Sequence, residues 1–225
     1  MTKIKLTHLE EQRYARQLSI TEISIEGQLK LKKAAVLIIG CGGLGSSIAL
    51  YLAGAGVGRI GLVDHDVVAL SDLSRQVAYS TDLIGKPKVF ALKERLSAIN
   101  PTITVEAYPS LFSAQNAEKI SAPYQILIDG TDNLKARYLI NDLCVFTGKP
   151  FVHGAVQRFY GQVAVFDASR GACYRCIYKE HSGPEMDHSQ HLDGIIGPVA
   201  GVIGLIQAME VLKLIIDLGS PLVSQ

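Results

Sequence analysis

The sequence lacks an excess of charge of either sign, has few cysteines and shows no long apolar segment at its N-terminus. Lysine and arginine number 22 against 21 aspartates and glutamates, a formal charge of +1. Such a balance offers no broad field for a nucleic acid or an anionic membrane. Four cysteines in 225 residues are too few for a disulfide scaffold. Because the first eleven residues are too polar for a secretory signal, we expect a cytoplasmic protein.

The longest apolar segment, residues 198–216, has the length of a membrane span. It contains Gln207, Glu210 and Lys213, side chains that are costly inside a bilayer. We therefore interpret it as a buried core helix or a helix at a subunit contact, without a membrane partner.

Short β-branched runs alternate with segments of helical period along most of the chain. This alternation predicts an α/β, doubly wound fold with a mostly parallel sheet, in one domain over residues 1–225. The alternating run 161–167 predicts an antiparallel strand at the far side of the sheet. We expect strands at 35–39, 59–63, 102–107, 125–128 and 150–153, and helices at 7–18, 44–55, 88–99, 113–121, 133–147 and 198–218.

A glycine-rich loop, Gly-Cys-Gly-Gly-Leu-Gly at 40–45, joins the first strand to the next helix. Glycines let the backbone approach a phosphate, and the helix then points its free N–H groups at that anion. Asp64 ends the following strand, where a carboxylate can bind a ribose hydroxyl. The pattern predicts a Rossmann-like nucleotide site without identifying the nucleotide.

Four further motifs surround this loop, and a dehydrogenase needs none of them. They are Arg-Tyr-Ala-Arg-Gln at 13–17, Ser-Asp-Leu-Ser-Arg-Gln at 71–76, Gly-Lys-Pro-Lys at 85–88 and Asp-Gly-Thr-Asp-Asn at 129–133. Together with the glycine-containing segments 51–58 and 197–204, they resemble the ThiF/MoeB/HesA family, prokaryotic relatives of the ubiquitin-activating enzymes. The resemblance runs from about Arg13 to Lys213.

The resemblance implies an adenylyltransferase that uses ATP to activate the C-terminal glycine carboxylate of a ubiquitin-fold sulfur-carrier protein. The products are an acyl-adenylate and pyrophosphate, for thiamine or molybdenum cofactor biosynthesis. A C-terminal carboxylate, with a pKa of ~3.5, is ionised at neutral pH, so its attack on the α-phosphorus needs no general base. Because one anion must approach another, fixed cations and magnesium should carry the catalysis.

The catalytic roles come from the resemblance. Lys88 is expected to contact the α-phosphate and the attacking oxygen, and Arg75 to hold the β- and γ-phosphates. Asp132 would hold magnesium, a hard cation suited to a carboxylate, and Asn133 would lie at the nucleotide. Asp132 could also cap the helix that follows it.

The remaining nucleotide contacts are expected along the same site. By resemblance, Asp64 binds the ribose, Gly43 lies under the phosphates, and Ser71, Asp72, Leu73 and Ser74 follow the triphosphate. Asp72 departs from the family pattern, because relatives usually carry asparagine there. The resulting negative charge implies either a weaker role for Asp72 or a lower affinity for the nucleotide.

Arg16 matches an arginine that reaches the triphosphate from the neighbouring subunit of a homodimer. The resemblance therefore implies that dimerisation completes the site. The apolar helix at 199–215 could face that partner, although ordinary core packing explains it equally well.

Cys173 and Cys176 match one of two Cys-x-x-C pairs that share a zinc ion in relatives, and the second pair is absent. Two thiolates alone cannot complete a tetrahedral site. His188 and His191 could supply the missing ligands, but a vestigial pair without metal is the leading interpretation. Zinc shared with a partner chain comes second.

No cysteine follows Cys176, so we expect the reaction to stop at the acyl-adenylate and a separate sulfurtransferase to deliver sulfur. Two other functions stay open. One is a non-catalytic paralogue that binds a carrier or ATP. The other is an NAD-dependent oxidoreductase, a hypothesis that only the glycine loop supports.

Overall fold

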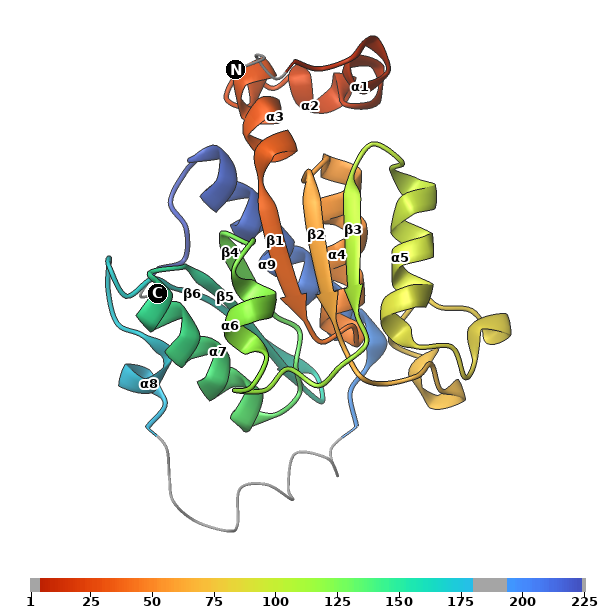
Figure 1. Ribbon diagram of the computed structural model, residues 1–225, viewed down its shortest axis with the longest axis vertical. Coiled ribbons are helices and arrows are strands. Elements are labelled where there is room, and N and C mark those ends of the chain that lie inside the picture. Colours follow the sequence, from red (N-terminus) through yellow and green to blue (C-terminus); the bar gives the residue numbers. More distant parts are fainter. Residues whose placement is uncertain (1–4, 180–193, 224–225) are drawn as a thin grey trace.

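The computed structural model describes residues 5–179 and 194–223. Its centre is a six-stranded sheet in the order β3-β2-β1-β4-β5-β6 (Figure 1). All neighbouring strands are parallel except β5 and β6, which pair antiparallel from Phe151–Phe166 to Gln157–Tyr160. The strands are β1 (Ala35–Ile39), β2 (Arg59–Val63), β3 (Thr104–Tyr108), β4 (Ile126–Asp129), β5 (Phe151–Gln157) and β6 (Tyr160–Phe166). The predicted fold class, including the antiparallel strand at the far side, is confirmed.

Helices cover both faces of the sheet. One face carries α4 (Gly43–Ala55), α5 (Lys88–Ile99) and α9 (Gly197–Ile216). Helix α3 (Ser24–Lys33) lies at the amino end of β1 (Figure 1) and packs against α2 and α9. The other face carries α6 (Ala117–Ser121), α7 (Leu134–Thr147) and α8 (Tyr174–Ile177). Because the sheet is covered on both sides, every residue of β1 is buried, as expected of a parallel strand in a doubly wound fold.

The N-terminal helices lie beyond the amino ends of the strands (Figure 1). The single helix predicted over 7–18 is two short helices, α1 (His8–Arg13) and α2 (Ala15–Leu18), separated at Tyr14. The Tyr14 side chain is buried and its hydroxyl accepts a hydrogen bond from Asn100 Nδ2 at 2.9 Å. This long-range contact holds the break in place. The sequence analysis also missed α3, whose segment has few apolar residues and a weak helical pattern.

Several predicted boundaries differ from the observed ones. The helices α5, α4 and α7 begin within one residue of the prediction. The helix expected from residue 113 begins only at Ala117, because the Asn116 side chain holds the preceding turn by accepting a hydrogen bond from Ser113 N. Strand β5 continues four residues beyond the predicted end at His153, since β6 pairs with it along its whole length.

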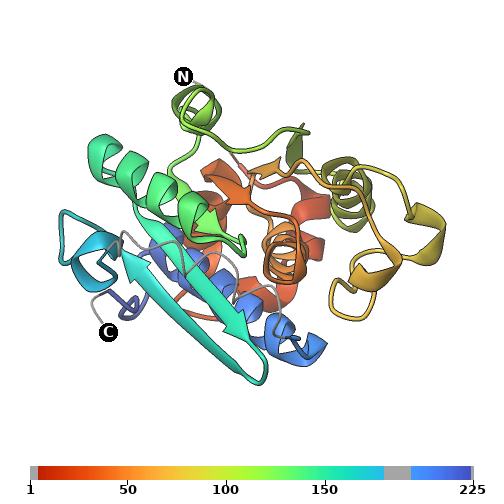
Figure 2. The ribbon, with the colours of Figure 1, turned by 90° about the horizontal axis from the view of Figure 1, so that it is seen from below.

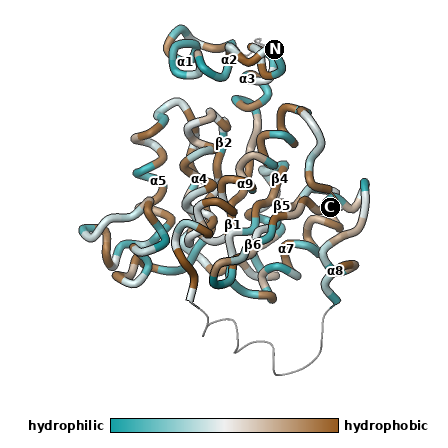
Figure 3. The backbone as a smooth tube through the Cα atoms, turned by 180° about the vertical axis from the view of Figure 1, so that it is seen from behind, coloured by the Kyte–Doolittle hydropathy of each residue, from teal (hydrophilic) through white to brown (hydrophobic). Residues whose placement is uncertain are grey.

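Helix α9 is long and apolar enough to cross a membrane by length and composition, and its apolar colouring is visible in Figure 3. In the fold it packs against α4, β5 and β6. Its polar residues Gln207 and Glu210 are buried, and each has a partner. Gln207 Nε2 donates to the Asp129 carbonyl at 2.8 Å, and Glu210 accepts from Leu222 N at 2.8 Å. Helix α9 therefore packs into the core along one side, as predicted, and the alternative of a subunit contact stays a prediction.

Candidate functional site

A cleft of about 830 Å³ opens at the carboxyl ends of β1, β2 and β4. Figure 2 looks onto this end of the sheet. The strand order reverses between β1 and β4, and the crevice at such a reversal is where doubly wound proteins bind ligands. The volume lies in the range of small-molecule and cofactor sites.

The glycine loop forms the floor of the cleft. Gly40 has a φ of +89°, and a Cβ added there would lie 2.6 Å from the Gly130 carbonyl oxygen. A Cβ on Gly45 would collide with the Gly40 carbonyl oxygen. Helix α4 begins at Gly43 without a side-chain cap, so its first N–H groups are available to an anion at the cleft.

Asp64 supports this loop from the end of β2. Its Oδ2 accepts a hydrogen bond from Cys41 N at 2.7 Å, and its Oδ1 accepts one from Asp66 N at 2.9 Å. Both Asp64 and Gly43 line the cleft. Binding of a ribose by Asp64 stays a prediction.

Two cations and a buried carboxylate form the wall beside the loop. Lys88, the first residue of α5, is 5% exposed, and its Nζ lies 3.3 Å from Asp66 Oδ2 and 3.4 Å from Asp72 Oδ2. Arg75 Nη2 lies 3.1 Å from Asp72 Oδ1. All four side chains line the cleft, so the structure brings the two predicted cations together around Asp72.

The rest of the segment 71–74 points elsewhere. Leu73 packs against the hydrophobic core, while Ser71 and Ser74 are exposed. The Ser71 carbonyl accepts hydrogen bonds from the Ser74 hydroxyl and from Arg75 Nη1. None of the three is among the residues that line the cleft, and their predicted nucleotide contacts remain untested.

Asp132 and Asn133 lie between β4 and α7, and both line the cleft. Asn133 is the N-cap of α7, and its Oδ1 accepts a hydrogen bond from Ala136 N at 2.9 Å. The alternative that Asp132 caps this helix is therefore wrong. Asp132 is exposed, so its carboxylate is accessible to a cation, and the donor type fits magnesium.

The sequence analysis missed a buried charge cluster behind this loop. Asp129 Oδ2 lies 2.8 Å from His153 Nδ1 and 3.4 Å from Arg137 Nε, and Asp129 Oδ1 accepts from the Thr131 hydroxyl at 2.6 Å. Burial opposes ionisation of Asp129, but the hydrogen bond from His153 and the charge of Arg137 outweigh it and lower its pKa. Arg137 and Thr131 reach the cleft.

Other lining residues were also missed. Gln76 is 2% exposed and donates from Nε2 to Asp72 Oδ1 at 3.0 Å. Gln76 follows Arg75 in the motif at 71–76, and this position could have indicated that it lines the cleft. Leu111 and Phe112 line the cleft beyond the end of β3. Because ligands of doubly wound proteins bind at the carboxyl ends of parallel strands, the position of these residues after a predicted strand could have indicated them.

Arg16 is exposed on α2 and does not line the cleft. Figure 1 shows α2 beyond the amino ends of the strands, whereas the cleft lies at their carboxyl ends. Arg13 is held within the chain, because its Nη1 donates to the Ile99 carbonyl at 2.7 Å. Arg16 therefore lies far from the cleft of its own chain.

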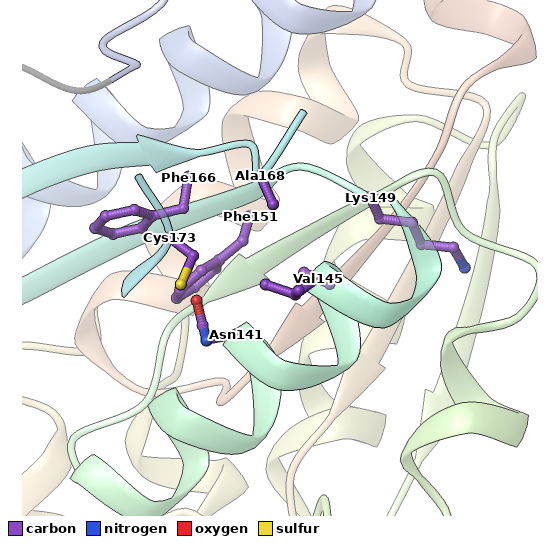
Figure 4. Close-up of a pocket in the computed structure, with 8 residues that line it drawn as sticks. Asn141, Val145, Lys149, Phe151, Phe166, Ala168 and Cys173 are labelled. Atoms are coloured by element: carbon purple, nitrogen blue, oxygen red, sulfur yellow. The ribbon is translucent and has the colours of Figure 1, made fainter. Parts of the chain in front are cut away.

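The cysteine pair lies at α8, away from the cleft. Cys173 Sγ and Cys176 Sγ are 3.5 Å apart, and Figure 4 shows Cys173 beside Asn141 of α7. Burial opposes ionisation of Cys173, but hydrogen bonds from Cys176 and from the Arg175 backbone outweigh it, so its pKa is lowered. Within residues 5–179 and 194–223, no cluster of three potential metal ligands includes this pair. His188 and His191 lie outside the described residues.

Comparisons with known proteins agree with this geometry. The model of the ThiF family matches residues 14–225. The chain is 42% identical over 224 residues to the sulfur carrier protein adenylyltransferase of Thermus thermophilus, a match that covers 97% of this chain and 83% of that protein. It is also 42% identical over 213 residues to adenylyltransferase and sulfurtransferase MOCS3 of Anopheles gambiae, with 95% and 48% covered. The chain thus spans about half the length of the MOCS3 relatives.

A solved structure has the same fold. The crystal structure of E. coli MccB with AMPCPP and MccA superposes with a TM-score of 0.81 at 28% sequence identity. The superposition covers 95% of this chain and 66% of the MccB chain.

Proposed function

The chain belongs to the ThiF family, and we propose that it is an ATP-dependent adenylyltransferase. Its substrate is the C-terminal glycine carboxylate of a ubiquitin-fold sulfur-carrier protein, which it converts to an acyl-adenylate with release of pyrophosphate. The names of the relatives support the reaction class. The observation that carries the proposal is the convergence of Lys88, Arg75 and Asp132 with the loop at Gly43 on one cleft.

The cleft residues meet the electrostatic demand of this reaction. The carrier terminus arrives as an anion, so the barrier lies in bringing it to the α-phosphate. Lys88 is held in a largely buried position at the start of α5, where a fixed charge stabilises the transition state more than it would in water. Arg75 neutralises the charge that grows on the departing pyrophosphate, and the α4 N-terminus adds backbone N–H groups.

The charge balance of the cleft supports a requirement for magnesium. Among the described lining residues, Asp64, Asp66, Asp72 and Asp132 carry four negative charges, whereas Lys88, Arg75 and Arg137 carry three positive charges. This balance cannot by itself neutralise a triphosphate. We assign magnesium to the exposed carboxylate of Asp132, where it would offset phosphate charge.

The same shortage of positive charge supports an arginine from a second copy. Arg16 is exposed on α2, and α2 lies beyond the amino ends of the strands (Figure 1). Arg16 is therefore available to a neighbouring cleft and not to its own. Helix α9 also leaves an apolar stripe exposed at helical spacing, formed by Val202, Leu205, Ile206 and Met209. A homodimer that covers this stripe accounts for both features.

Pyrophosphate exchange tests the proposed reaction. With Mg·ATP and carriers that end in Gly-Gly, one from thiamine and one from molybdenum cofactor biosynthesis, the wild type should incorporate labelled pyrophosphate into ATP. Lys88→Ala should abolish the exchange. Lys86→Ala is the matched control, because Lys86 pairs with Glu94 at 2.6 Å and does not line the cleft.

Other outcomes would identify the alternatives. If no carrier supports exchange while calorimetry shows binding of Mg·ATP or of a carrier, the chain is a non-catalytic paralogue. Binding of NAD without binding of ATP would contradict both and favour an oxidoreductase. If exchange is observed, we expect a separate sulfurtransferase to transfer sulfur to the carrier adenylate.

A further inference from the structure

Asp132, the carboxylate to which magnesium is assigned, is exposed, whereas the residues on either side of it are held by hydrogen bonds. We infer that Thr131 is a positioning residue, which presents Asp132 to the cleft through a turn that its hydroxyl closes on Asp129. The inference rests on the proposed function, because it takes the role of Asp132 from it. It assigns to Thr131 a contact within the protein and none with the metal.

The turn before Asp132 is closed by two hydrogen bonds to one carboxylate oxygen. Asp129 Oδ1 accepts from Thr131 N at 2.9 Å and from Thr131 Oγ1 at 2.6 Å. An aspartate that bonds the backbone two residues further on stabilises a local turn. Asp129 Oδ2 lies 2.8 Å from His153 Nδ1, and both residues are fully buried. Because both oxygens of this carboxylate have buried partners, Thr131 is bonded to a fixed acceptor.

The other side of Thr131 is held by α7. The Thr131 carbonyl accepts a hydrogen bond from Arg137 Nη2 at 3.3 Å, and Arg137 is a buried residue near the start of that helix. Asn133 caps the same helix through Ala136 N. The backbone of Asp132 is therefore fixed from both sides, and its side chain extends from a rigid support.

The same turn is in backbone contact with the glycine loop. Gly130 N donates to the Ile39 carbonyl at 2.8 Å, and a Cβ on Gly130 would lie 2.6 Å from the Gly40 carbonyl oxygen. A cation shared between Asp132 and phosphates above the glycine loop needs the spacing of the two loops to be set before it binds. The hydroxyl of Thr131 should therefore contribute to the affinity for a magnesium–nucleotide complex through Asp132.

Thr131→Val tests this role, because it keeps the β-branched shape and removes the hydroxyl that donates to Asp129. The probe is the magnesium complex of AMPCPP, an ATP analogue with a methylene bridge between the α- and β-phosphates, and calorimetric titration gives its Kd without turnover. We expect the Kd to rise about tenfold, since residues that hold a metal ligand in place typically contribute a factor of that order to metal affinity. Thr131→Ser keeps the hydroxyl and should retain the wild-type Kd.

A double-mutant cycle with Asp132→Ala shows whether Thr131 acts through Asp132. In the Asp132→Ala background, Thr131→Val should change the Kd for Mg·AMPCPP by less than about twofold, because the carboxylate that it positions is gone. A role in general stability, or a direct contact with the nucleotide, would give the same loss in both backgrounds.

Thr102→Val is the matched control. Thr102 N and Oγ1 both donate to Asn100 Oδ1, at 3.2 and 2.7 Å, so the substitution removes a hydroxyl from the same kind of turn. Thr102 does not line the cleft, and the Kd for Mg·AMPCPP should stay at the wild-type value. Thermal denaturation of each variant identifies a folding defect. If Thr131→Val does not fold, Thr131→Ala removes the same hydroxyl without adding a methyl group.

Two results would overturn the inference. One is a Kd for Mg·AMPCPP that Thr131→Val leaves unchanged, and the other is a loss of equal size in the Asp132→Ala background. A wild type that does not bind Mg·AMPCPP would overturn it as well.

The inference and the proposed function fail on different measurements. If the wild type catalyses no pyrophosphate exchange with any carrier but the cycle gives the expected Kd values, the proposed reaction fails and the role of Thr131 stands. If exchange is observed and the losses of the cycle are additive, the reaction stands and the role of Thr131 fails.

Discussion

At the scale of single residues, buried ionisable groups in this protein are held by partners of opposite charge or by hydrogen-bond donors. Lys88 and Asp72 are examples at the cleft, and Asp129 is the example in the core, where its exposure is 0%. A buried charge without a partner is strongly destabilising. Each of these groups therefore links the local geometry of the site to the stability of the fold.

Asp129 gives a prediction on stability and pH. Its pKa is lowered in the folded state, so its contribution is fully present above the unfolded value of about 3.9 and is lost as pH falls through the folded pKa. Asp129→Asn should reduce the free energy of unfolding by about 3 kcal/mol at pH 7. The difference from wild type should shrink below about pH 4. Urea denaturation at a series of pH values measures both effects.

Asp142 provides the control for that experiment. It forms an ion pair with Arg175 at 2.6 Å, but both side chains are 36% exposed. Asp142→Asn should therefore cost less than about 1 kcal/mol at pH 7. If the two substitutions destabilise the protein equally, the buried cluster of Asp129, His153 and Arg137 does not have the role described.

At the scale of elements, three of the helices that border the cleft begin next to residues with an expected role at the nucleotide. Helix α4 follows the glycine loop, α5 begins with Lys88, and α7 begins after Asp132 and Asn133. Of two neighbouring residues, one can therefore cap the helix while the other faces a ligand. At α7 this division assigns the cap to Asn133 and leaves Asp132 exposed.

The division at α7 is testable with two adjacent substitutions. Asn133→Ala should lower the free energy of unfolding by about 1 kcal/mol, because it removes the side-chain acceptor for Ala136 N. Asp132→Ala should change stability by less than about 0.5 kcal/mol while abolishing magnesium-dependent exchange. Denaturant titration and exchange assays measure the pair, and an equal loss of stability in both would contradict the assignment.

At the scale of the whole molecule, the sheet separates the predicted arginine from the predicted lysine. Helix α2, which carries Arg16, lies beyond the amino ends of the strands (Figure 1), and Lys88 lines the cleft at their carboxyl ends. A site that contains both residues therefore needs two copies of the chain. The exposed stripe on α9 offers a surface on which the copies could meet. Dimerisation would then be a condition for activity.

Mixing two inactive variants tests this arrangement. Arg16→Ala and Lys88→Ala should each lose exchange activity. When they are unfolded together and refolded as a mixture, half of the dimers should be mixed, and each should hold one intact site. The mixture should regain about a quarter of the wild-type activity. If mixed dimers form but the activity does not recover, Arg16 does not act across subunits.

Much of the fold could be predicted because its signals are local. The five buried positions of β1 and the helical period of α5 place these elements within a residue. The break at Tyr14 could not be predicted, because Asn100, 86 positions along the chain, holds it. Helix α3 was missed because its stability comes from packing against α2 and α9 and not from its own pattern.

The sequence by itself determined the glycine loop, the order of the strands and of the longer helices that follow it, and the residue types that could serve a nucleotide. Only the tertiary structure decided that Lys88 and Arg75 share Asp72, that Asn133 and not Asp132 caps α7, and that His153 pairs with Asp129. The physical reason is that residue type and period are written along the chain, whereas charge pairing depends on distances between side chains that the sheet brings together.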